Sequence, residues 1–207
     1  MGKLTALVGL LVVAVAIAQQ PTPCKLPPAF QSRASVYDHD RNQLDRFLIA
    51  YDEVNHRKVL FEEQLVVIPG RRFFEFLTFN NENLMYTVNL REKTCTKSVP
   101  RPWRDYGIPP DATFELEYTM GGPGESFMVQ DWSDRIPLKK TETWFGSFTL
   151  TNCYPVSQVT IDRENLTETS TTMFYDFVTG LPDPDIFIPP PECNNATWSE
   201  PPYYPKL

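Results

Sequence analysis

The chain has 207 residues, a formal net charge of −7 at pH 7, and 13% aromatic residues. This acidic balance argues against nucleic acid and anionic membrane surfaces as electrostatic partners. Prolines (20) outnumber glycines (9), and abundant proline and aromatic residues suit strands joined by stiff turns better than helices. We therefore expect a β protein, and the length fits a single domain.

Residues 1–18 have the pattern of a secretory signal peptide. Lys3 supplies a positive start, residues 4–17 are almost wholly apolar, and Ala16-Ile17-Ala18 offers a cleavage site of small residues. The apolar run is too short for a lasting membrane anchor, and no later stretch approaches the roughly 18 apolar residues of a spanning helix. We expect an exported product that is not an integral membrane protein.

The cysteines contain no Cys-x-x-Cys pair, and the chain has only two histidines, so a zinc cluster is disfavoured. An even number of cysteines in an exported chain favours two disulfides. Their spacing leaves three pairings open. We predict that all four are bridged and that no cofactor is bound; no metal ligands are identified. The cysteines are Cys24, Cys95, Cys153 and Cys193.

Short apolar or alternating runs separated by turn residues follow one another along the chain, and they predict antiparallel strands. The clearest alternation is at residues 113–120, whereas the proline-rich stretch 100–110 interrupts the pattern. We expect one β domain over residues 19–193 and a flexible tail over 194–207. The candidate strands are residues 33–37, 47–51, 57–61, 72–79, 85–89, 94–99, 113–120, 126–132, 143–150 and 169–178.

The aromatic residues on the predicted strands suit either a packed core or the wall of an apolar pocket. Because side chains alternate between the two faces of a strand, a register shift of one residue would turn every one of them to the other face. The pocket residues chosen by this alternation are Phe76, Tyr86, Val88, Tyr118, Val129 and Trp144.

No motif of a catalytic site is present. The chain lacks a Gly-x-Ser-x-Gly elbow, a phosphate-binding glycine loop and a His-Glu-x-x-His pair. We therefore predict that the protein is not an enzyme. Asn165-Leu-Thr167 and Asn195-Ala-Thr197 are acceptors for N-glycosylation in an exported chain.

Six segments together resemble the ependymin-related proteins, and they look closer to the mammalian-type branch than to the fish brain ependymins. They occur in the family's order, and the resemblance runs from about Cys24 to Cys193. The segments are Ile108–Phe114, Tyr118–Pro123, Val129–Arg135, Glu142–Gly146, Cys153–Val156 and Asp183–Cys193.

The resemblance implies an all-β fold in which two antiparallel sheets stack into a half-open sandwich with an apolar pocket, like bacterial lipoprotein carriers. It also implies the bridges Cys24–Cys153 and Cys95–Cys193. The implied protein is a secreted glycoprotein, extracellular or lysosomal and homodimeric, that binds hydrophobic, lipid-like ligands and calcium. The alternative is calcium-dependent cell–matrix adhesion through collagen or other matrix, or a place in an extracellular, even mineral, matrix without ligand transport.

Overall fold

The computed structural model describes residues 21–66, 72–134, 142–162 and 169–200. The predicted signal peptide and the predicted glycosylation site at Asn165 therefore lie outside the described residues. These described residues form three short 3-10 helices, η1 (Asn80–Glu82), η2 (Pro184–Phe187) and η3 (Pro191–Asn195), besides the strands. In chain order the strands are β1 (Ala29–Asp38), β2 (Gln43–Asp52), β3 (Arg57–Gln64), β4 (Arg72–Phe79), β5 (Leu84–Asn89), β6 (Thr94–Ser98), β7 (Thr113–Gly122), β8 (Glu125–Ser133), β9 (Glu142–Thr149), β10 (Pro155–Asp162), β11 (Ser170–Thr179) and β12 (Thr197–Trp198).

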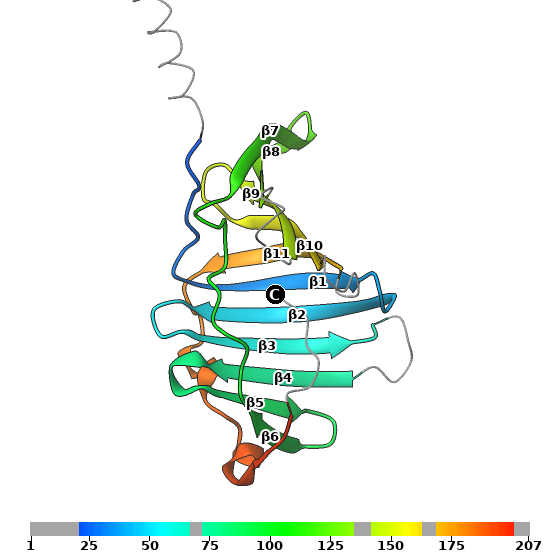
Figure 1. The fold of residues 1–207 in the computed structure, drawn as a ribbon, viewed down its shortest axis with the longest axis vertical. Coiled ribbons are helices and arrows are strands. Elements are labelled where there is room, and N and C mark those ends of the chain that lie inside the picture. The colour runs from blue at the N-terminus through cyan, green and yellow to red at the C-terminus, as the bar shows by residue number, and fades with distance from the viewer. Residues whose placement is uncertain (1–20, 67–71, 135–141, 163–168, 201–207) are drawn as a thin grey trace, which may run out of the picture.

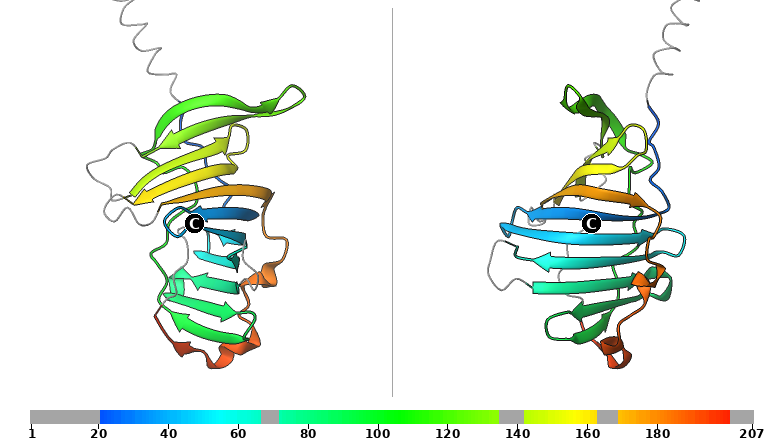
Figure 2. Two further views of the ribbon diagram at one scale, coloured as in Figure 1. Left: turned by 90° about the vertical axis from the view of Figure 1, so that its right-hand side faces the viewer. Right: turned by 180° about the vertical axis from the view of Figure 1, so that it is seen from behind.

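The expectation of an all-β fold is confirmed, but the described strands form one sheet rather than two stacked sheets. The order across this 12-stranded sheet is β12-β6-β5-β4-β3-β2-β1-β11-β10-β9-β8-β7. β1 joins the half of the sheet formed by β2 to β6 to the half formed by β7 to β11, because it pairs with β2 on one side and with β11 on the other. Figures 1 and 2 show the twist that accumulates from β6 to β7, as expected for a large antiparallel sheet.

Each strand from β1 to β6 pairs with the next along the chain, and short turns join β1 to β2, β2 to β3, β4 to β5 and β5 to β6. Several turns need a left-handed residue, and polar side chains occupy these positions: φ is 50° at Asn42, 47° at His56 and 52° at Asn83. Asparagine tolerates this conformation better than most residues. These turns fix the register of the sheet and therefore decide which side chains share a face.

Residues 99–112, which we call the strap, run from β6 across one face of the sheet to β7 (Figure 1). The Trp103 ring stacks on Tyr51 with centroids 5.2 Å apart, and the Tyr106 ring meets Phe30 edge-on at 5.5 Å. We call this side the strap face. It carries the larger core cluster, which includes the fully buried Ile49. Burial of this much aromatic and aliphatic surface is the main stabilising contribution to the fold.

The opposite side, which we call the open face, is covered at one end by η2 and η3. Phe187 of η2 is buried against this end, in a cluster with Val59 and Leu77. The guanidinium of Arg57 lies 4.1 Å from the centroid of the Phe187 ring, a cation–π geometry. The remainder of the open face over β1 to β4 is left uncovered by these helices.

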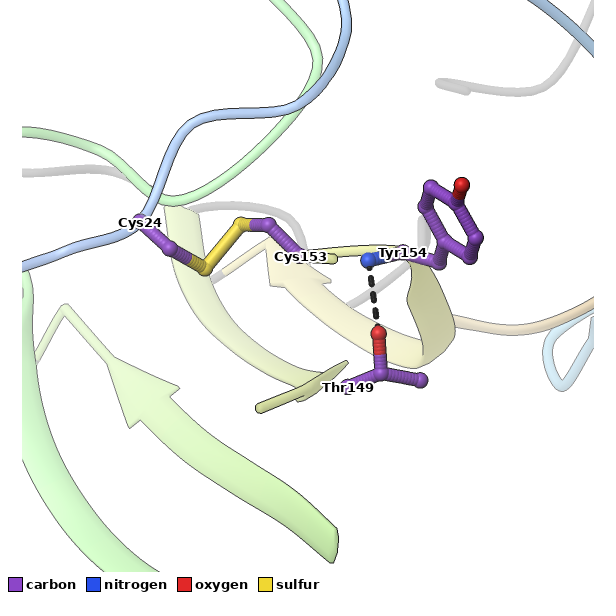
Figure 3. Close-up of a disulfide and its surroundings, with 4 residues drawn as sticks. All are labelled: Cys24, Thr149, Cys153 and Tyr154. Carbon is purple, nitrogen blue, oxygen red and sulfur yellow. Dashed lines mark hydrogen bonds between the residues drawn. A yellow bond between two sulfur atoms is a disulfide. The ribbon is translucent and has the colours of Figure 1, made fainter. Parts of the chain in front are cut away.

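Two disulfides fasten the ends of the domain to the sheet. Cys24 is bonded to Cys153, which fixes the segment before β1 to the turn between β9 and β10 (Figure 3). Next to this bond, the Tyr154 amide donates a hydrogen bond to Thr149 Oγ1 at 2.9 Å. Cys95 of β6 is bonded to Cys193 of η3. The pairing is the one that the family resemblance implied.

The tail expected from residue 194 onwards is paired with the sheet as far as it is described. Thr197 and Trp198 form β12, which lies parallel to β6, and the Ser199 amide donates to the Lys97 carbonyl at 2.8 Å. The disulfide at Cys193 brings this segment to the edge of the sheet, where the backbone groups on the outer side of β6 form hydrogen bonds with it. Residues 201–207 lie outside the described part of the chain.

Candidate functional site

A groove of about 730 Å³ crosses the open face over β1 to β4 and reaches β11. It lies at the opposite end of this face from η2 and η3, as the register of the strands requires. The face is the one seen from behind in Figure 2. The residues that line the groove are Arg33, Ser35, Arg46, Phe47, Leu48, Phe61, Glu62, Glu63, Phe73, Phe74, Leu90 and Tyr175.

Apolar side chains form part of the floor of the groove. Leu48 and Phe61 are directly opposite each other on β2 and β3, and both are half-buried. Phe73 is 39% exposed and Leu90 is 42% exposed, although both carry large apolar side chains. A contiguous group of exposed apolar side chains is unfavourable in water and marks a surface that a ligand or partner can cover.

Two arginines lie beside this apolar floor. Arg33 forms an exposed ion pair with Asp176 of β11, with Nη1 and Oδ2 3.7 Å apart, a contact of little energetic weight. Arg46 makes no hydrogen bond or ion pair with another residue in the described ranges. The groove therefore combines an apolar surface with a guanidinium that is able to receive an anion.

Glu62 belongs to the strand that crosses the groove, but its carboxyl group points to the strap face and is only 2% exposed. Burial, reinforced by the nearby carboxylate of Asp45, raises the pKa of Glu62 to about 8. Gln64 Nε2 donates to one carboxyl oxygen at 2.8 Å, whereas the other oxygen has no hydrogen-bond partner. Glu62 is therefore mostly protonated at pH 7 and does not offset the positive charge of Arg33 and Arg46.

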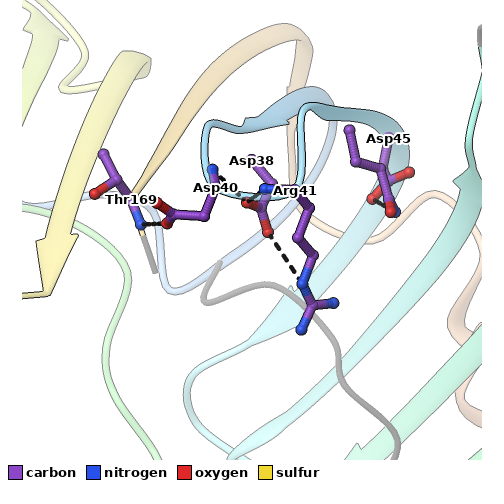
Figure 4. A network of polar contacts seen from close by, with 6 residues as sticks. Asp38, Asp40, Arg41, Asp45 and Thr169 are labelled. Atoms are coloured by element: carbon purple, nitrogen blue, oxygen red, sulfur yellow. Dashed lines mark hydrogen bonds and ion pairs between the residues drawn. The ribbon is translucent and has the colours of Figure 1, made fainter. Parts of the chain in front are cut away.

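The turn between β1 and β2 adds further carboxylates at this end of the strap face (Figure 4). Asp38 accepts hydrogen bonds from the backbone amides of Asp40 and Arg41, and Asp40 in turn accepts one from the Thr169 amide at 2.7 Å. Burial, first of all, raises the pKa of Asp45, although hydrogen bonds from Leu65 and Gln43 oppose the shift. These contacts tie β1 and β2 to the start of β11.

Glu75 is a second buried acid, on the open face between Phe61 and Val88. Burial and, to a smaller extent, the charge of Glu192 raise the pKa of Glu75 to about 7. Because Glu192 belongs to η3, the ionisation of Glu75 is coupled to the segment that covers this end of the open face.

The structure separates the six pocket residues predicted from strand alternation. Phe76 and Trp144 lie with the core of the strap face. Tyr86 and Val88 lie on the open face, under the cluster covered by η2 and η3.

Tyr118 and Val129 are cross-strand neighbours on β7 and β8, in the other half of the sheet. None of the six lines the groove, and their role in a pocket stays a prediction. The groove residues that sequence reasoning missed, such as Leu48 and Phe73, could have been found only from the register between strands.

The remaining predictions concern modification, metals and membranes. Asn195 is exposed at the end of η3, so its side chain is accessible to a glycan. Within the described ranges, no group of three or more His, Cys, Asp or Glu side chains is arranged to hold a metal ion. No helix in the same ranges is long and apolar enough to cross a membrane.

The fold and the groove define a class of protein: one twisted sheet, antiparallel apart from β12, that is packed on one face and carries a groove on the other. The Ependymin family model matches residues 69–193. Mammalian ependymin-related protein 1 of Rattus norvegicus is 36% identical over 177 residues, covering 85% of this chain and 78% of the rat protein. Ependymin-2 of Carassius auratus is 27% identical over 186 residues, covering 87% and 83%. The chain belongs to the ependymin family.

A solved structure of an uncharacterized conserved protein from Thermus thermophilus shares the fold. Its TM-score is 0.54 at 10% sequence identity, and the match covers 85% of this chain and 92% of the other. A LolA superfamily protein from Nitrosomonas europaea matches with a TM-score of 0.39 at 10% identity over 79% and 91% of the two chains. This second likeness is too weak to support an argument about fold or ligand.

Proposed function

We propose that the protein is a secreted, non-enzymatic binding protein that holds a single-chain amphiphile with an anionic headgroup in the groove of the open face. The observation that carries the proposal is the apolar floor of Leu48 and Phe61 beside the guanidinium of Arg46, which has no hydrogen-bond or ion-pair partner in the described part of the chain. A hydrocarbon chain would cover the exposed apolar surface, and a carboxylate or phosphate would receive charge-assisted hydrogen bonds from Arg46.

The size of the groove supports a small ligand. Its volume of about 730 Å³ falls within the range of 300–1,000 Å³ typical of small-molecule sites. The groove is open on one side, so a ligand can enter without a large movement of the sheet. With the buried Glu62 protonated, Glu63 is the carboxylate that remains among the lining residues beside Arg33 and Arg46, and two guanidinium groups against one carboxylate favour an anion.

Secretion and glycosylation complete the proposal. The apolar start of the chain and the two bridges favour an extracellular or lysosomal setting, and the exposed Asn195 is available for a glycan. Calcium binding and homodimer formation remain predictions from the family resemblance.

The test uses full-length protein purified without detergent. Binding of dodecanoate, dodecanol and dodecylamine is measured by displacement of a fluorescent fatty acid and by native mass spectrometry. We expect dodecanoate to bind most tightly, Arg46→Gln to weaken it at least tenfold, and Leu48→Gln to weaken all three probes. Arg72→Gln, on the same sheet but at the start of β4 and on the strap face, is the matched control and should change little.

Two results would overturn the proposal. One is that none of the three probes is retained by the wild-type protein. The other is that Arg46→Gln and Leu48→Gln bind dodecanoate as tightly as Arg72→Gln does. If either is found while the protein associates with collagen in a calcium-dependent manner, the adhesion alternative becomes the better description.

A further inference from the structure

One row of residues crosses the open face from the groove to the surface beneath η2 and η3. Leu48 on β2 is opposite Phe61 on β3, and Phe61 is opposite Glu75 on β4. Glu75 in turn is opposite Val88 on β5. Leu48 and Phe61 line the groove, whereas Val88 belongs to the cluster that contains Phe187 of η2. Phe61 also packs against that cluster, so the groove is continuous with the apolar surface beneath η2.

The edge of the covered surface crosses β4 at Glu75. Along the open face of this strand, the exposed fraction of the side chain falls from 39% at Phe73 to 7% at Glu75 and 0% at Leu77. Leu77 lies in the same cluster as Phe187 of η2 and Cys193 of η3. Glu75 is therefore a carboxyl group that is buried at the boundary between the groove and the segment above the rest of this face.

Residues 181–192, which we call the lid, are held to the sheet by side chains rather than by backbone hydrogen bonds. Within the described ranges, the backbone hydrogen bonds of these residues all stay within residues 181–193. Both ends are anchored: the Gly180 amide donates to the Ala29 carbonyl at 2.8 Å, and Cys193 is bonded to Cys95. Between these anchors Phe187 is buried to 4% exposure. The lid can therefore lift without breaking a backbone hydrogen bond of the sheet.

The charge of Glu75 opposes a closed lid. Burial, followed by the like charge of Glu192, raises the pKa of Glu75 to about 7. When water reaches Glu75, its pKa returns toward 4.5. The closed lid is thus most stable below pH 4.5, where Glu75 keeps its proton in either position, and loses stability as pH rises to about 7. The titratable groups of the surrounding elements are Arg57 and Glu63 on β3, Tyr86 on β5, Lys97 on β6, Asp185 of η2 and Glu192 of η3.

We propose that the lid covers a second part of the binding site, that it is closed in acid and lifts near neutral pH, and that it is displaced by the hydrocarbon chain of a long amphiphile. The chain would replace the Phe187 ring against Val59 and Leu77. This inference rests on the amphiphile proposed for the groove, because the same ligand would place its headgroup at Arg46 and its chain end under the lid. Only the fraction of protein with a lifted lid accepts the chain, so affinity follows that fraction.

The movement of the lid is measured first without a ligand. Cys193 is 4% exposed beside the lid, and Cys153 of the other disulfide is 3% exposed, so the second bond is an internal reference. The full chain is treated with a phosphine reductant at pH 5 and at pH 7.5, and mass spectrometry gives the ratio of the two reduction rates. Global unfolding and the pH dependence of the reagent act on both bonds and cancel in this ratio. We expect the Cys193 bond to gain at least tenfold at pH 7.5, with a limit of about fiftyfold if lifting brings Glu75 fully into water.

Three variants assign the effect. Glu75→Gln carries no charge at either pH, so its ratio at pH 7.5 should stay as low as at pH 5. Phe187→Ala removes the ring that holds the lid, so its ratio should be high at both pH values. Ile188→Ala is the matched control, because Ile188 is the next residue and is 64% exposed; it should respond as the wild type does.

Two sulfonates, which keep their charge at both pH values, then test the ligand by calorimetric titration below their micelle concentrations. Octanesulfonate probes the groove alone, and its affinity should change by less than threefold between pH 5 and pH 7.5. Hexadecanesulfonate should bind at least tenfold more tightly at pH 7.5 than at pH 5. Glu75→Gln should remove this difference, and Phe187→Ala should bind the long chain tightly at both pH values.

The proposal is overturned if the reduction ratio does not change with pH, or if Glu75→Gln responds as the wild type does. It is also overturned if hexadecanesulfonate binds equally at the two pH values while octanesulfonate binds, and in that case the groove stands alone. If neither sulfonate binds, the function proposed for the groove fails and the role of the lid in binding a chain fails with it. The reduction ratio still decides whether Glu75 controls the movement of the lid.

Discussion

Substitution of Glu62 by glutamine should stabilise the protein at neutral pH and leave it unchanged in acid. The carboxyl group is 2% exposed, and its pKa is raised from 4.5 to about 8 by burial and by Asp45. In the native state Glu62 therefore keeps its proton up to about pH 8, whereas the unfolded chain loses it above pH 4.5. The free energy of unfolding falls as pH rises through this window, because the unfolded state binds fewer protons.

The magnitude follows from the width of the window. Each pH unit between the two pKa values corresponds to about 1.4 kcal/mol. At pH 7 the wild type should therefore have lost about 3 kcal/mol from this one group relative to pH 4.5. Glu62→Gln keeps the shape and removes the titration, so it should be more stable than wild type by a comparable amount at pH 7.

The assay is denaturant unfolding of both proteins at a series of pH values from 4.5 to 8.5. The difference in unfolding free energy should grow from near zero at pH 4.5 to about 3 kcal/mol at pH 7 and should level off near about 5 kcal/mol above pH 8. Glu63→Gln, the neighbouring residue on the opposite face of β3, is the control and should shift stability by no more than about 1 kcal/mol. If Glu62→Gln and the wild type show the same slope with pH, Glu62 does not carry the effect and the reasoning is refuted.

Three other substitutions test the packing. Gly146→Ala should destabilise the protein by about 1–3 kcal/mol, because a Cβ there would lie 2.3 Å from Cζ2 of Trp144; an unchanged melting temperature would contradict this. Trp103→Ala should lower the unfolding free energy by about 3 kcal/mol through loss of the strap contact, measured by denaturant titration, and no loss would mean that the strap contributes little. Replacement of Cys95 and Cys193 by serine opens a loop with a sequence separation of 98 and should cost about 4–5 kcal/mol. It should also expose residues near η3 to limited proteolysis, and a digestion pattern like that of the wild type would argue against this tether.

Local patterns predicted most strands because turn residues and alternation act over short distances. The strand Thr113–Gly122 was predicted over residues 113–120, but its alternation is interrupted by a bulge between Phe114 and Leu116, which turns Phe114 and Tyr118 to different faces. The strand Pro155–Asp162 was not predicted, since it begins at a proline and mixes small polar residues with valine and isoleucine. It forms because β9 and β11 supply hydrogen-bonded neighbours on both sides, and that information is not local.

The candidate site was harder to predict for a related reason. Alternation shows that Phe76 and Thr78 share a face, but not whether that face is packed or open. Arg46 and Phe73 come from strands separated by another strand, and only the register between them places both at one groove. The side chain of Glu62 gave no signal in sequence, because its raised pKa depends on burial by residues far along the chain.

The sequence by itself determined the all-β character, the even set of cysteines and, through six ordered segments, the family. These depend on composition, on period-two alternation and on short motifs, all of which can be read along the chain. The tertiary structure decided that the described strands form one sheet rather than two, because β1 pairs on both sides. It also decided which face stays open and that Glu75 lies between Phe61 and Val88, since hydrogen-bond register and burial are set by residues distant in sequence.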